Sequence, residues 1–412
     1  MEKTKRYIIA TAGILLHLML GSTYAWSVYR NPILQETGWD QAPVAFAFSL
    51  AIFCLGLSAA FMGNLVEQYG PRLTGTVSAI LYASGNMLTG LAIDRKEIWL
   101  LYIGYGVIGG LGLGAGYITP ISTIIKWFPD KRGMATGFAI MGFGFASLLT
   151  SPIAQWLIET EGLVATFYLL GLIYLIVMLF ASQLIIKPTA AEIAILDKKR
   201  LQNNSYLIEG MTAKEALKTK SFYCLWVILF INITCGLGLI SVVAPMAQDL
   251  TGMSPEMSAI VVGAMGIFNG FGRLVWASLS DYIGRRVTVI LLFLVSIIMT
   301  ISLIFAHSSL IFMISIATLM TCYGAGFSLI PPYLSDLFGA KELATLHGYI
   351  LTAWAIAALT GPMLLSITVE WTHNYLLTLC VFIVLYILGL MVALRLKKRC
   401  PIKNLKVNPS KA

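Results

Sequence analysis

Charged residues are scarce in this sequence. Only 11% of its 412 residues are Asp, Glu, Lys or Arg, whereas 58% are hydrophobic and the mean hydropathy is +0.83. A soluble domain of this length could not bury so much apolar surface. The sequence also lacks a catalytic dyad, a metal-ligand cluster and a phosphate-binding loop, which argues against an enzyme and against nucleotide-driven pumping. We therefore expect an integral membrane protein that uses no cofactor and no metal.

Cysteine is rare as well. The six cysteines are scattered, mostly within apolar runs, and no two form a CxxC pair. This pattern indicates small packing residues and predicts neither a metal site nor a disulfide.

Apolar runs of about 20 residues or more recur along the whole chain, and each could cross a hydrocarbon core of about 30 Å. Lipid offers no partner to an open backbone, and short alternating strands are missing, so the runs are predicted to be helices. The first run has no small-residue cleavage site and is predicted to remain as a span. We expect an all-α membrane protein with twelve spans, at 7–29, 44–66, 72–93, 98–121, 134–157, 163–186, 222–248, 256–280, 287–306, 310–335, 343–368 and 372–395.

Basic residues predict the orientation. When the connections are assigned to alternating sides, the side of the N-terminus carries 24 Lys and Arg residues, and the other side carries three, Arg30, Arg95 and Lys96. Basic residues concentrate on the cytoplasmic side of membrane proteins, so both termini are predicted to be cytoplasmic. The net charge of +9 reflects this bias, and we infer no nucleic-acid binding from it.

The sequence contains two related halves. The segment 63–73 (GNLVEQYGPRL) joins the second and third spans, and 277–287 (ASLSDYIGRRV) joins the eighth and ninth. Their shared acid, glycine and arginine lie 214 residues apart, so that Glu67, Gly70 and Arg72 correspond to Asp281, Gly284 and Arg286. A second repeat, offset by 210 residues, relates GAGY at 114–117 to GAGF at 324–327, and therefore Tyr117 to Phe327.

This repeat predicts the domain organisation. We expect an N-terminal six-helix bundle over 1–186, a cytoplasmic linker over 187–220, a C-terminal six-helix bundle over 221–396 and a basic tail over 397–412. Within the linker, Thr212 and Glu215 have the spacing of a capping box and predict a short helix before the seventh span.

The two acidic Gly-Arg loops resemble the cytoplasmic signature of the major facilitator superfamily. Four stretches are similar to the oxalate:formate antiporter family and its bacterial monocarboxylate-transporter relatives: GSTYAWSVYRNP at 21–32, GYGVIGGLGLGAGYITP at 104–120, KWFPDKRG at 126–133 and NGFGR at 269–273. The resemblance covers almost the entire chain. It implies two pseudo-symmetric halves that rock about a central site, in a monomeric multi-pass protein of the cell membrane.

The resemblance also suggests a role for the six loop residues. The acid and the arginine of each loop can bond to neighbouring helix ends and latch the two halves in one state, although simple helix capping is the alternative. The fourth span, with seven glycines between Gly104 and Gly116, fits close helix packing in a bundle that rocks.

Arg273 is the only charged residue in the middle of a predicted span, because every other charge falls at a span end or in a connection. It lies eight residues before Asp281, which places it about 12 Å inside the bilayer at 1.5 Å per residue. A centred arginine costs about 2.5–3.5 kcal/mol on insertion scales, and no carboxylate within a span can pair with it. We expect an external anion to compensate it, held by the two parallel bonds that a guanidinium can donate to a carboxylate. Bonding to backbone carbonyls at a helix break is the alternative.

Several uncharged residues are predicted to complete the site. Asn269 lies one turn before Arg273 on the same face and could donate to the substrate. Tyr117 and Phe327 are symmetry-related candidates, and Tyr24 and His17 share a face of the first span. His17 is a candidate proton carrier or a packing residue.

Trp354 predicts the charge of the substrate. The resemblance places it where members that exchange oxalate carry a lysine, so only one fixed cation remains. One cation balances a monocarboxylate but leaves a dicarboxylate with uncompensated charge in a low dielectric. We expect lactate, pyruvate, formate or a similar anion as the substrate. Oxalate–formate exchange is the alternative within this class, and a carboxylate sensor that does not transport is the alternative from another.

The mode of coupling stays open. Animal monocarboxylate transporters have an aspartate where this chain has Asn269, which cannot titrate. Proton symport would need another carrier, such as His17, Tyr24 or bound water, whereas anion exchange would need none.

Overall fold

The computed structural model describes residues 2–189, 191–192 and 210–396, and the predicted tail and the middle of the linker lie outside this part of the chain. Within it, twelve helices are long and apolar enough to cross a membrane. The prediction of an all-α membrane protein with twelve spans is confirmed.

The helices of the N-terminal half build six of these spans. They are α1 (Glu2–Leu20), the 3-10 helix η1 (Gly21–Ala25), α2 (Trp26–Thr37), α3 (Gln41–Tyr69), α4 (Pro71–Arg95), α5 (Ile98–Leu101), the π-helix η2 (Tyr102–Gly109), α6 (Gly110–Trp127), α7 (Arg132–Glu161) and α8 (Leu163–Leu184).

The C-terminal half begins with α10 (Ala213–Ala216), a short helix capped by the capping box of Thr212 and Glu215, as predicted. It continues through α11 (Lys220–Ile240), α12 (Val243–Thr251), α13 (Pro255–Ile283), α14 (Arg285–Ile304), α15 (Ser309–Phe338), α16 (Leu343–Thr372) and α17 (Leu376–Arg395).

The seventh span differs from its prediction. We expected one helix over 222–248, but α11 ends at Ile240 and α12 begins at Val243. Pro245 explains the break, because a proline has no N–H to donate and its ring clashes with the carbonyl four residues earlier, here that of Ser241.

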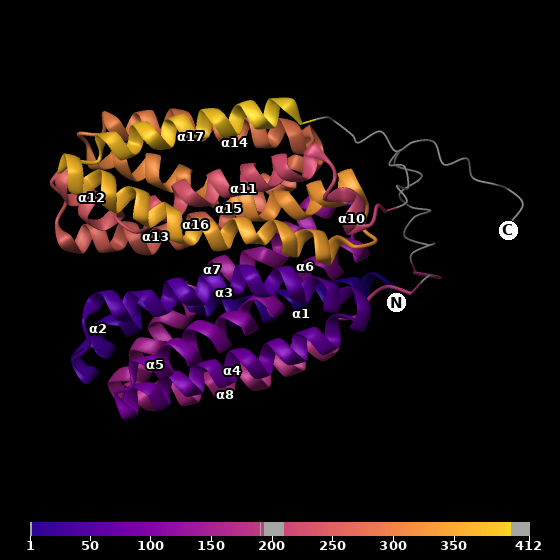
Figure 1. Cartoon of the computed structure of the whole chain (residues 1–412), viewed down its shortest axis with the longest axis horizontal. Coiled ribbons are helices and arrows are strands. Elements are labelled where there is room, and N and C mark those ends of the chain that lie inside the picture. Colours follow the sequence, from indigo (N-terminus) through magenta and orange to yellow (C-terminus); the bar gives the residue numbers. More distant parts are fainter. Residues whose placement is uncertain (1, 190, 193–209, 397–412) are drawn as a thin grey trace, which may run out of the picture.

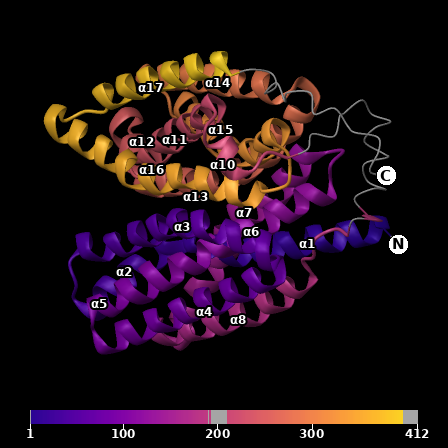
Figure 2. The same cartoon turned by 45° about the vertical axis from the view of Figure 1, so that its right-hand side comes forward.

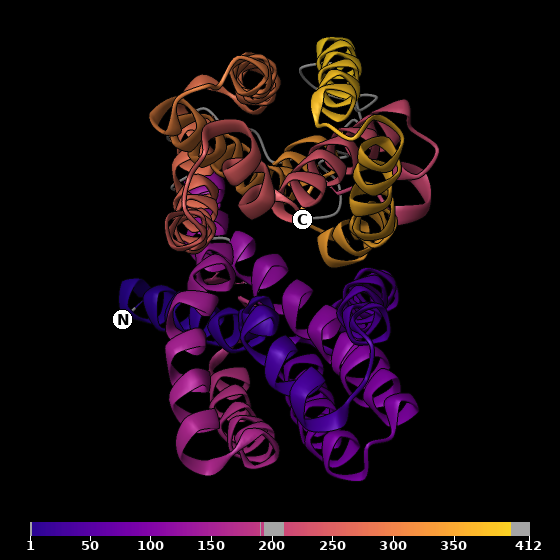
Figure 3. The same ribbon diagram turned by 90° about the vertical axis from the view of Figure 1, so that its left-hand side faces the viewer.

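The two halves lie side by side, with the N-terminal half in indigo and magenta and the C-terminal half in orange and yellow (Figures 1 and 2). The end-on view of Figure 3 shows the same two bundles as separate groups of helices. The start of α1 and the end of α17 lie at the same end of the molecule, which we call the termini end (Figure 1).

The most extensive contacts between the halves are those of α3 with α16 and of α7 with α13, and α15 and α16 make smaller contacts with α7 and α6. Glycines let their backbones touch. A Cβ on Gly348 would clash with the Ala59 carbonyl, and a Cβ on Gly137 would lie 2.8 Å from the Arg273 carbonyl oxygen. We call these contacts the glycine seam, formed by Gly56, Gly63 and Gly348 between α3 and α16 and by Gly133, Gly137 and Gly144 between α7 and α13.

The glycine seam is confined to the termini end and the middle of the molecule. Further along α13, a Cβ on Gly266 would meet only Ser147 Oγ, at 3.4 Å, and a Cβ on Gly263 would meet nothing within 4 Å. The hydrogen bonds and ion pairs between the halves are likewise concentrated at the termini end. The described structure is therefore tightly closed at the termini end and more loosely packed at the opposite end.

Candidate functional site

Arg273 is completely buried in the middle of α13. Its Nε donates to Oδ1 of Asn269 at 3.1 Å, and its Nη1 donates to the carbonyl oxygen of Ile140 on α7 at 3.3 Å. Its Nη2 has no hydrogen-bond partner among the described residues, and none of their ion pairs includes it. The Ile140 contact partly fits the backbone-carbonyl alternative, but it leaves the charge of the guanidinium uncompensated.

A cluster of four aromatic rings lies against the guanidinium, two of them in direct contact with it. Its central carbon lies 5.0 Å from the ring of Phe327 and 5.7 Å from that of Phe143. Trp354 packs against Phe327 at a centroid distance of 4.6 Å and against Tyr117 at 5.4 Å, and Tyr117 lies 5.4 Å from Phe143. Aromatic faces stabilise a cation only in part. We call Tyr117, Phe143, Phe327 and Trp354 the aromatic cage; each half of the protein supplies two of its rings.

Buried polar atoms in the aromatic cage lack partners. Besides Arg273 Nη2, the hydroxyl of Tyr117 and the indole Nε1 of Trp354 form no hydrogen bond with the described residues. Buried polar groups are nearly always hydrogen-bonded in native proteins, so three such groups in one place mark a candidate binding site. All three groups can donate a hydrogen bond, and the Arg273 and Trp354 nitrogens can only donate, so the site is suited to a molecule with acceptor oxygens.

Tyrosines of both halves extend this set. Tyr24 on η1 packs edge-on against Phe143 at 5.1 Å, and its hydroxyl is close to Tyr323 and Arg273. Tyr323 lies one turn before Phe327 on α15, with ring centroids 5.4 Å apart. The hydroxyls of Tyr24 and Tyr323 also form no hydrogen bond of ordinary geometry within the described chain.

The six residues predicted for substrate binding all lie in or beside the aromatic cage. The structure shows one difference in detail, because Asn269 was expected to donate to a ligand and here accepts from Arg273. Sequence reasoning missed Phe143, Tyr323 and His347. His347 is buried, lies seven residues before Trp354 on α16, and places its ring 6.1 Å from Tyr117. A second histidine inside a span was a readable signal, whereas nothing distinguishes Phe143 from other apolar residues of its helix.

His17 lies behind the aromatic cage on α1. Its ring is completely buried, 5.3 Å from the ring of Tyr117 and 6.3 Å from that of Phe143. Both ring nitrogens contact backbone carbonyl oxygens, Nδ1 that of Ala139 at 2.7 Å and Nε2 that of Tyr117 at 2.9 Å.

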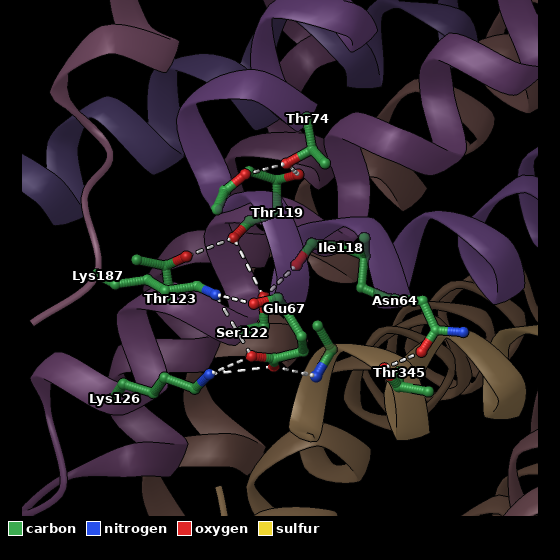
Figure 4. Close-up of polar contacts among 12 residues, drawn as sticks. Asn64, Glu67, Thr74, Ile118, Thr119, Ser122, Thr123, Lys126, Lys187 and Thr345 are labelled. Carbon is green, nitrogen blue, oxygen red and sulfur yellow. Dashed lines mark hydrogen bonds and ion pairs between the residues drawn. The ribbon is translucent and has the colours of Figure 1, made fainter. Parts of the chain in front are cut away.

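Glu67 connects the halves at the termini end. From the last turns of α3, its carboxylate accepts from the backbone N–H of Ala344, in the first turn of α16 in the opposite half, at 3.1 Å (Figure 4). Lys126 donates to both carboxylate oxygens, at 3.0 and 2.9 Å, and the ammonium of Lys187 lies 3.6 Å away. Burial lowers the pKa of Lys187, and the nearby Glu67 carboxylate opposes this effect. Glu67 thus caps a helix of the other half while two lysines of its own half balance its charge.

Asp281 repeats this arrangement from the C-terminal half. From the last turn of α13, its two oxygens accept from the backbone N–H groups of Gly133 and Met134, in the first turn of α7, at 3.0 and 2.8 Å. Arg285 balances its charge at 2.6 Å. The two acids of the repeated loops therefore cap the N-termini of two symmetry-related helices, each in the opposite half.

An ion pair between the halves was not predicted. Asp336, near the end of α15, accepts from Arg132 of α7 at 3.0 Å and from Arg285 at 3.0 Å. Arg132 and Asp336 lie outside the two repeated loop segments, which is why the repeat alone did not identify this ion pair.

The arginines and glycines of the loops act within their own halves. Arg72 donates to the carbonyl of Gln183 on α8 at 2.9 Å, and Arg286 donates to the carbonyls at the end of α17. Gly70 and Gly284 adopt φ values of 87° and 89°, where a side chain would strain the backbone. In this conformation the carboxylates cross between the halves and the arginines hold helix ends beside them.

Twelve spans in two halves, with a charged site buried between them, define a membrane transporter rather than an enzyme. The chain belongs to the Major Facilitator Superfamily, whose family model matches residues 11–362 and 225–411. It is therefore a multi-pass membrane protein, as the sequence predicted.

Curated relatives include an uncharacterized MFS-type transporter, YhjX, of Escherichia coli, 29% identical over 86% of both chains. The oxalate:formate antiporter of Oxalobacter formigenes is 27% identical over 98% of this chain and 94% of its own. Monocarboxylate transporter 2 of Rattus norvegicus is 24% identical over 87% of this chain and 78% of its own. The predicted resemblance to oxalate:formate antiporters and monocarboxylate transporters is confirmed.

Solved structures of the same fold include the proton:xylose symporter XylE, with a TM-score of 0.72 over 96% of this chain and 95% of that one. The transporter FucP, in an outward conformation, matches with a TM-score of 0.71 over 94% of this chain and 98% of its own. Both are 15% identical to this chain, and we use them for the fold alone.

Proposed function

We propose that this protein is a secondary active transporter of a small monocarboxylate such as lactate, pyruvate or formate. One observation carries the proposal: Arg273 is fully buried, has no carboxylate partner among the described residues, and is enclosed by groups that can donate hydrogen bonds and have no acceptor. An isolated buried cation is destabilising, so an anion from outside is the partner that this arrangement requires.

The aromatic cage favours a small ligand. Its rings approach one another to centroid distances of 4.6–6.2 Å. Carboxylate oxygens can accept from Arg273 Nη2, from the Tyr117 hydroxyl and from Trp354 Nε1, while the rings contact a short apolar substituent. Loading the site would require the rings to move apart, which rocking of the two halves can supply because each half contributes two of them.

The charge of the site favours one carboxylate. Trp354 presents an uncharged N–H, so Arg273 is the sole cation in the aromatic cage, and a monoanion neutralises it. Relatives named monocarboxylate transporter 2 and apicoplast pyruvate carrier 1 support this substrate class. Exchange of oxalate for formate is the second candidate, because a relative of that name aligns with nearly the whole chain.

Transport would proceed by alternating access. The helix caps of Glu67 and Asp281 and the glycine seam close the termini end, and the opposite end is the looser one. If the termini are cytoplasmic, as the basic residues predict, the structure has the cytoplasmic side closed. Opening that side would break the contacts that the carboxylates of Glu67, Asp281 and Asp336 make with the opposite half.

Uptake by the purified protein in proteoliposomes tests the proposal. We expect labelled lactate or formate to enter, and oxalate to compete poorly at neutral pH. Liposomes without protein measure the leak of the undissociated acid. Strong competition by oxalate would favour the second candidate, and absence of carboxylate uptake or exchange would refute the substrate class.

A further inference from the structure

The two hydrogen-bond contacts of His17 suggest how transport is coupled. A neutral imidazole has one N–H and one nitrogen with a lone pair. Here both nitrogens face carbonyl oxygens, of Ala139 and Tyr117, which can only accept. In the neutral ring, one lone pair must therefore point at an oxygen less than 3 Å away, and that contact is repulsive. The doubly protonated ring instead donates to both oxygens.

The charges around His17 explain when the second proton can bind. The titratable groups that approach it are Tyr117 from α6, Arg273 from α13 and His347 from α16. From α7 it meets the Ala139 carbonyl and the ring of Phe143, neither of which titrates, and α8 directs Tyr174 towards Tyr82. No carboxylate is among these neighbours, so Arg273 opposes a second positive charge in the empty site.

A bound carboxylate reverses this balance. It neutralises Arg273, removes the repulsion, and leaves two carbonyl acceptors ready for an imidazolium. Arg273 and His17 are close enough for this effect, because Arg273 donates to the carbonyl of Ile140, the residue that follows Ala139 on α7. The side chains of His17 and Arg273 thus contact consecutive carbonyls of one helix.

We infer that His17 binds the proton that accompanies the substrate, which makes the protein a proton–monocarboxylate symporter. As the carboxylate binds, the lone-pair nitrogen of neutral His17 takes a proton from a hydronium ion on the side to which the site is open, so that one O–H bond breaks and one N–H bond forms. When the carboxylate leaves on the other side, Arg273 repels the imidazolium and the same N–H bond gives its proton to water. This inference rests on the proposed monocarboxylate transport and names its coupling ion.

His347 does not fit the same role. It is buried like His17, but its Nδ1 has no hydrogen-bond partner among the described residues. Its ring therefore does not lie between two acceptors that would stabilise the doubly protonated form. Asn269, whose side chain accepts a hydrogen bond from Arg273, cannot titrate.

Two transport measurements with His17→Gln test the inference. The first is exchange of labelled external lactate for unlabelled internal lactate without a pH gradient, which needs binding and rocking but no net proton movement. The second is accumulation of lactate driven by an alkaline interior, with internal pH followed by a trapped dye. We expect the variant to keep exchange within about threefold of the parent, because glutamine is neutral and of similar size, and to lose the gradient-driven accumulation and the associated acidification.

His307→Gln is the matched control, since His307 is an exposed histidine between α14 and α15, and it should preserve both activities. Gradient-driven accumulation by His17→Gln at the parental level would overturn the inference. Loss of exchange and accumulation together in a folded variant would also overturn it, because His17 would then be structural. A parent that exchanges lactate but never responds to the gradient would refute coupling and leave the proposed function standing, whereas a parent with neither activity would refute both.

Nitrogen NMR provides a test that does not need the His17 variant to fold. In ¹⁵N-histidine-labelled His347→Gln protein, the remaining histidines are His17 and the exposed His307 and His373, and the spectrum without lactate is the reference. We expect lactate to produce one doubly protonated imidazole signal, from His17. A spectrum that lactate leaves without such a signal would contradict the inference.

Discussion

Arg273 shows how a residue can serve function at the expense of stability. Its guanidinium is buried against aromatic rings and, within the described part of the chain, donates to the Asn269 side chain and the Ile140 carbonyl. Replacing buried charges by apolar residues of similar volume is often neutral or stabilising by about 1–4 kcal/mol. The empty transporter should therefore be less stable than a variant without this charge.

We predict that Arg273→Met raises the melting temperature of the empty protein and abolishes the further rise that substrate causes in the parent. Binding should weaken by about 2–5 kcal/mol, the usual effect of removing one partner of a buried charge pair. Thermal unfolding in detergent with and without lactate measures both effects. Arg95→Met, at an exposed position, should change neither. Normal stabilisation by lactate in Arg273→Met would place the substrate elsewhere.

Trp354 permits a prediction about substrate charge. Trp354→Lys adds a second cation to the aromatic cage and should favour dicarboxylates over monocarboxylates by about 1–3 kcal/mol where the new charge reaches the substrate. Competition of oxalate against lactate, in the parent and the variant, measures the change. Trp371→Lys, on the exposed end of α16, is the control and should leave the ratio unchanged. Strong oxalate competition already in the parent would contradict charge matching.

The sequence predicted much of the candidate site because its signals were chemical. An arginine within an apolar run and an asparagine one turn earlier are visible in one dimension, as is the symmetry that relates Tyr117 to Phe327. Phe143 gave no such signal, since its importance comes from packing between the halves. The acceptors of His17 are backbone carbonyls, which every residue has, so only their positions in space identify them.

At the scale of whole helices, the helix ends connect the two halves. Glu67 caps α16 and Asp281 caps α7, and in each case the acid and the capped helix belong to opposite halves. A capping side chain contributes about 0.5–2 kcal/mol to the helix that it caps. Because these caps form only when the termini end is closed, their free energy stabilises that conformation specifically.

We predict that Asp281→Asn and Glu67→Gln slow turnover more than they weaken equilibrium binding. Each should shift the populations towards opening at the termini end by about 1–2 kcal/mol, which is roughly 5- to 30-fold. Spin labels at the exposed residues Tyr69 and Tyr282, one on each half, should report a longer separation in part of the population. Asp94→Asn, exposed at the end of α4, is the control. Equal losses of affinity and rate would indicate another role for the acids.

The spans were predictable as elements because length and hydropathy suffice to identify them. Their interruptions were harder to predict. The change of α1 into the 3-10 helix η1 and the π-helix η2 before α6 depend on neighbouring backbones that approach across glycines, such as Gly85 against Gly109. Only the break before α12 had a local cause that could have been read in advance, Pro245.

The whole molecule adopts the described conformation by packing backbone against backbone along the glycine seam. We predict that Gly348→Ala disfavours this conformation, because its methyl group would clash with the Ala59 carbonyl. The same spin-label pair should show a shift towards opening at the termini end, and lactate uptake should slow. Gly263→Ala is the matched control on α13, where an added methyl meets open space. An unchanged distance distribution in Gly348→Ala would mean that the seam does not limit closure.

The glycine seam also limits how this protein can vary. A glycine can change only by becoming larger, so no substitution in the seam is conservative, although the seam binds no substrate and carries no charge. The aromatic cage, by contrast, can exchange one ring for another, as the symmetry-related Tyr117 and Phe327 illustrate within a single chain. In a saturation-mutagenesis screen for growth on a transported carboxylate, the seam should tolerate fewer substitutions than the substrate site. New substrate preferences should therefore arise through substitutions in the aromatic cage, while the glycine seam stays nearly constant.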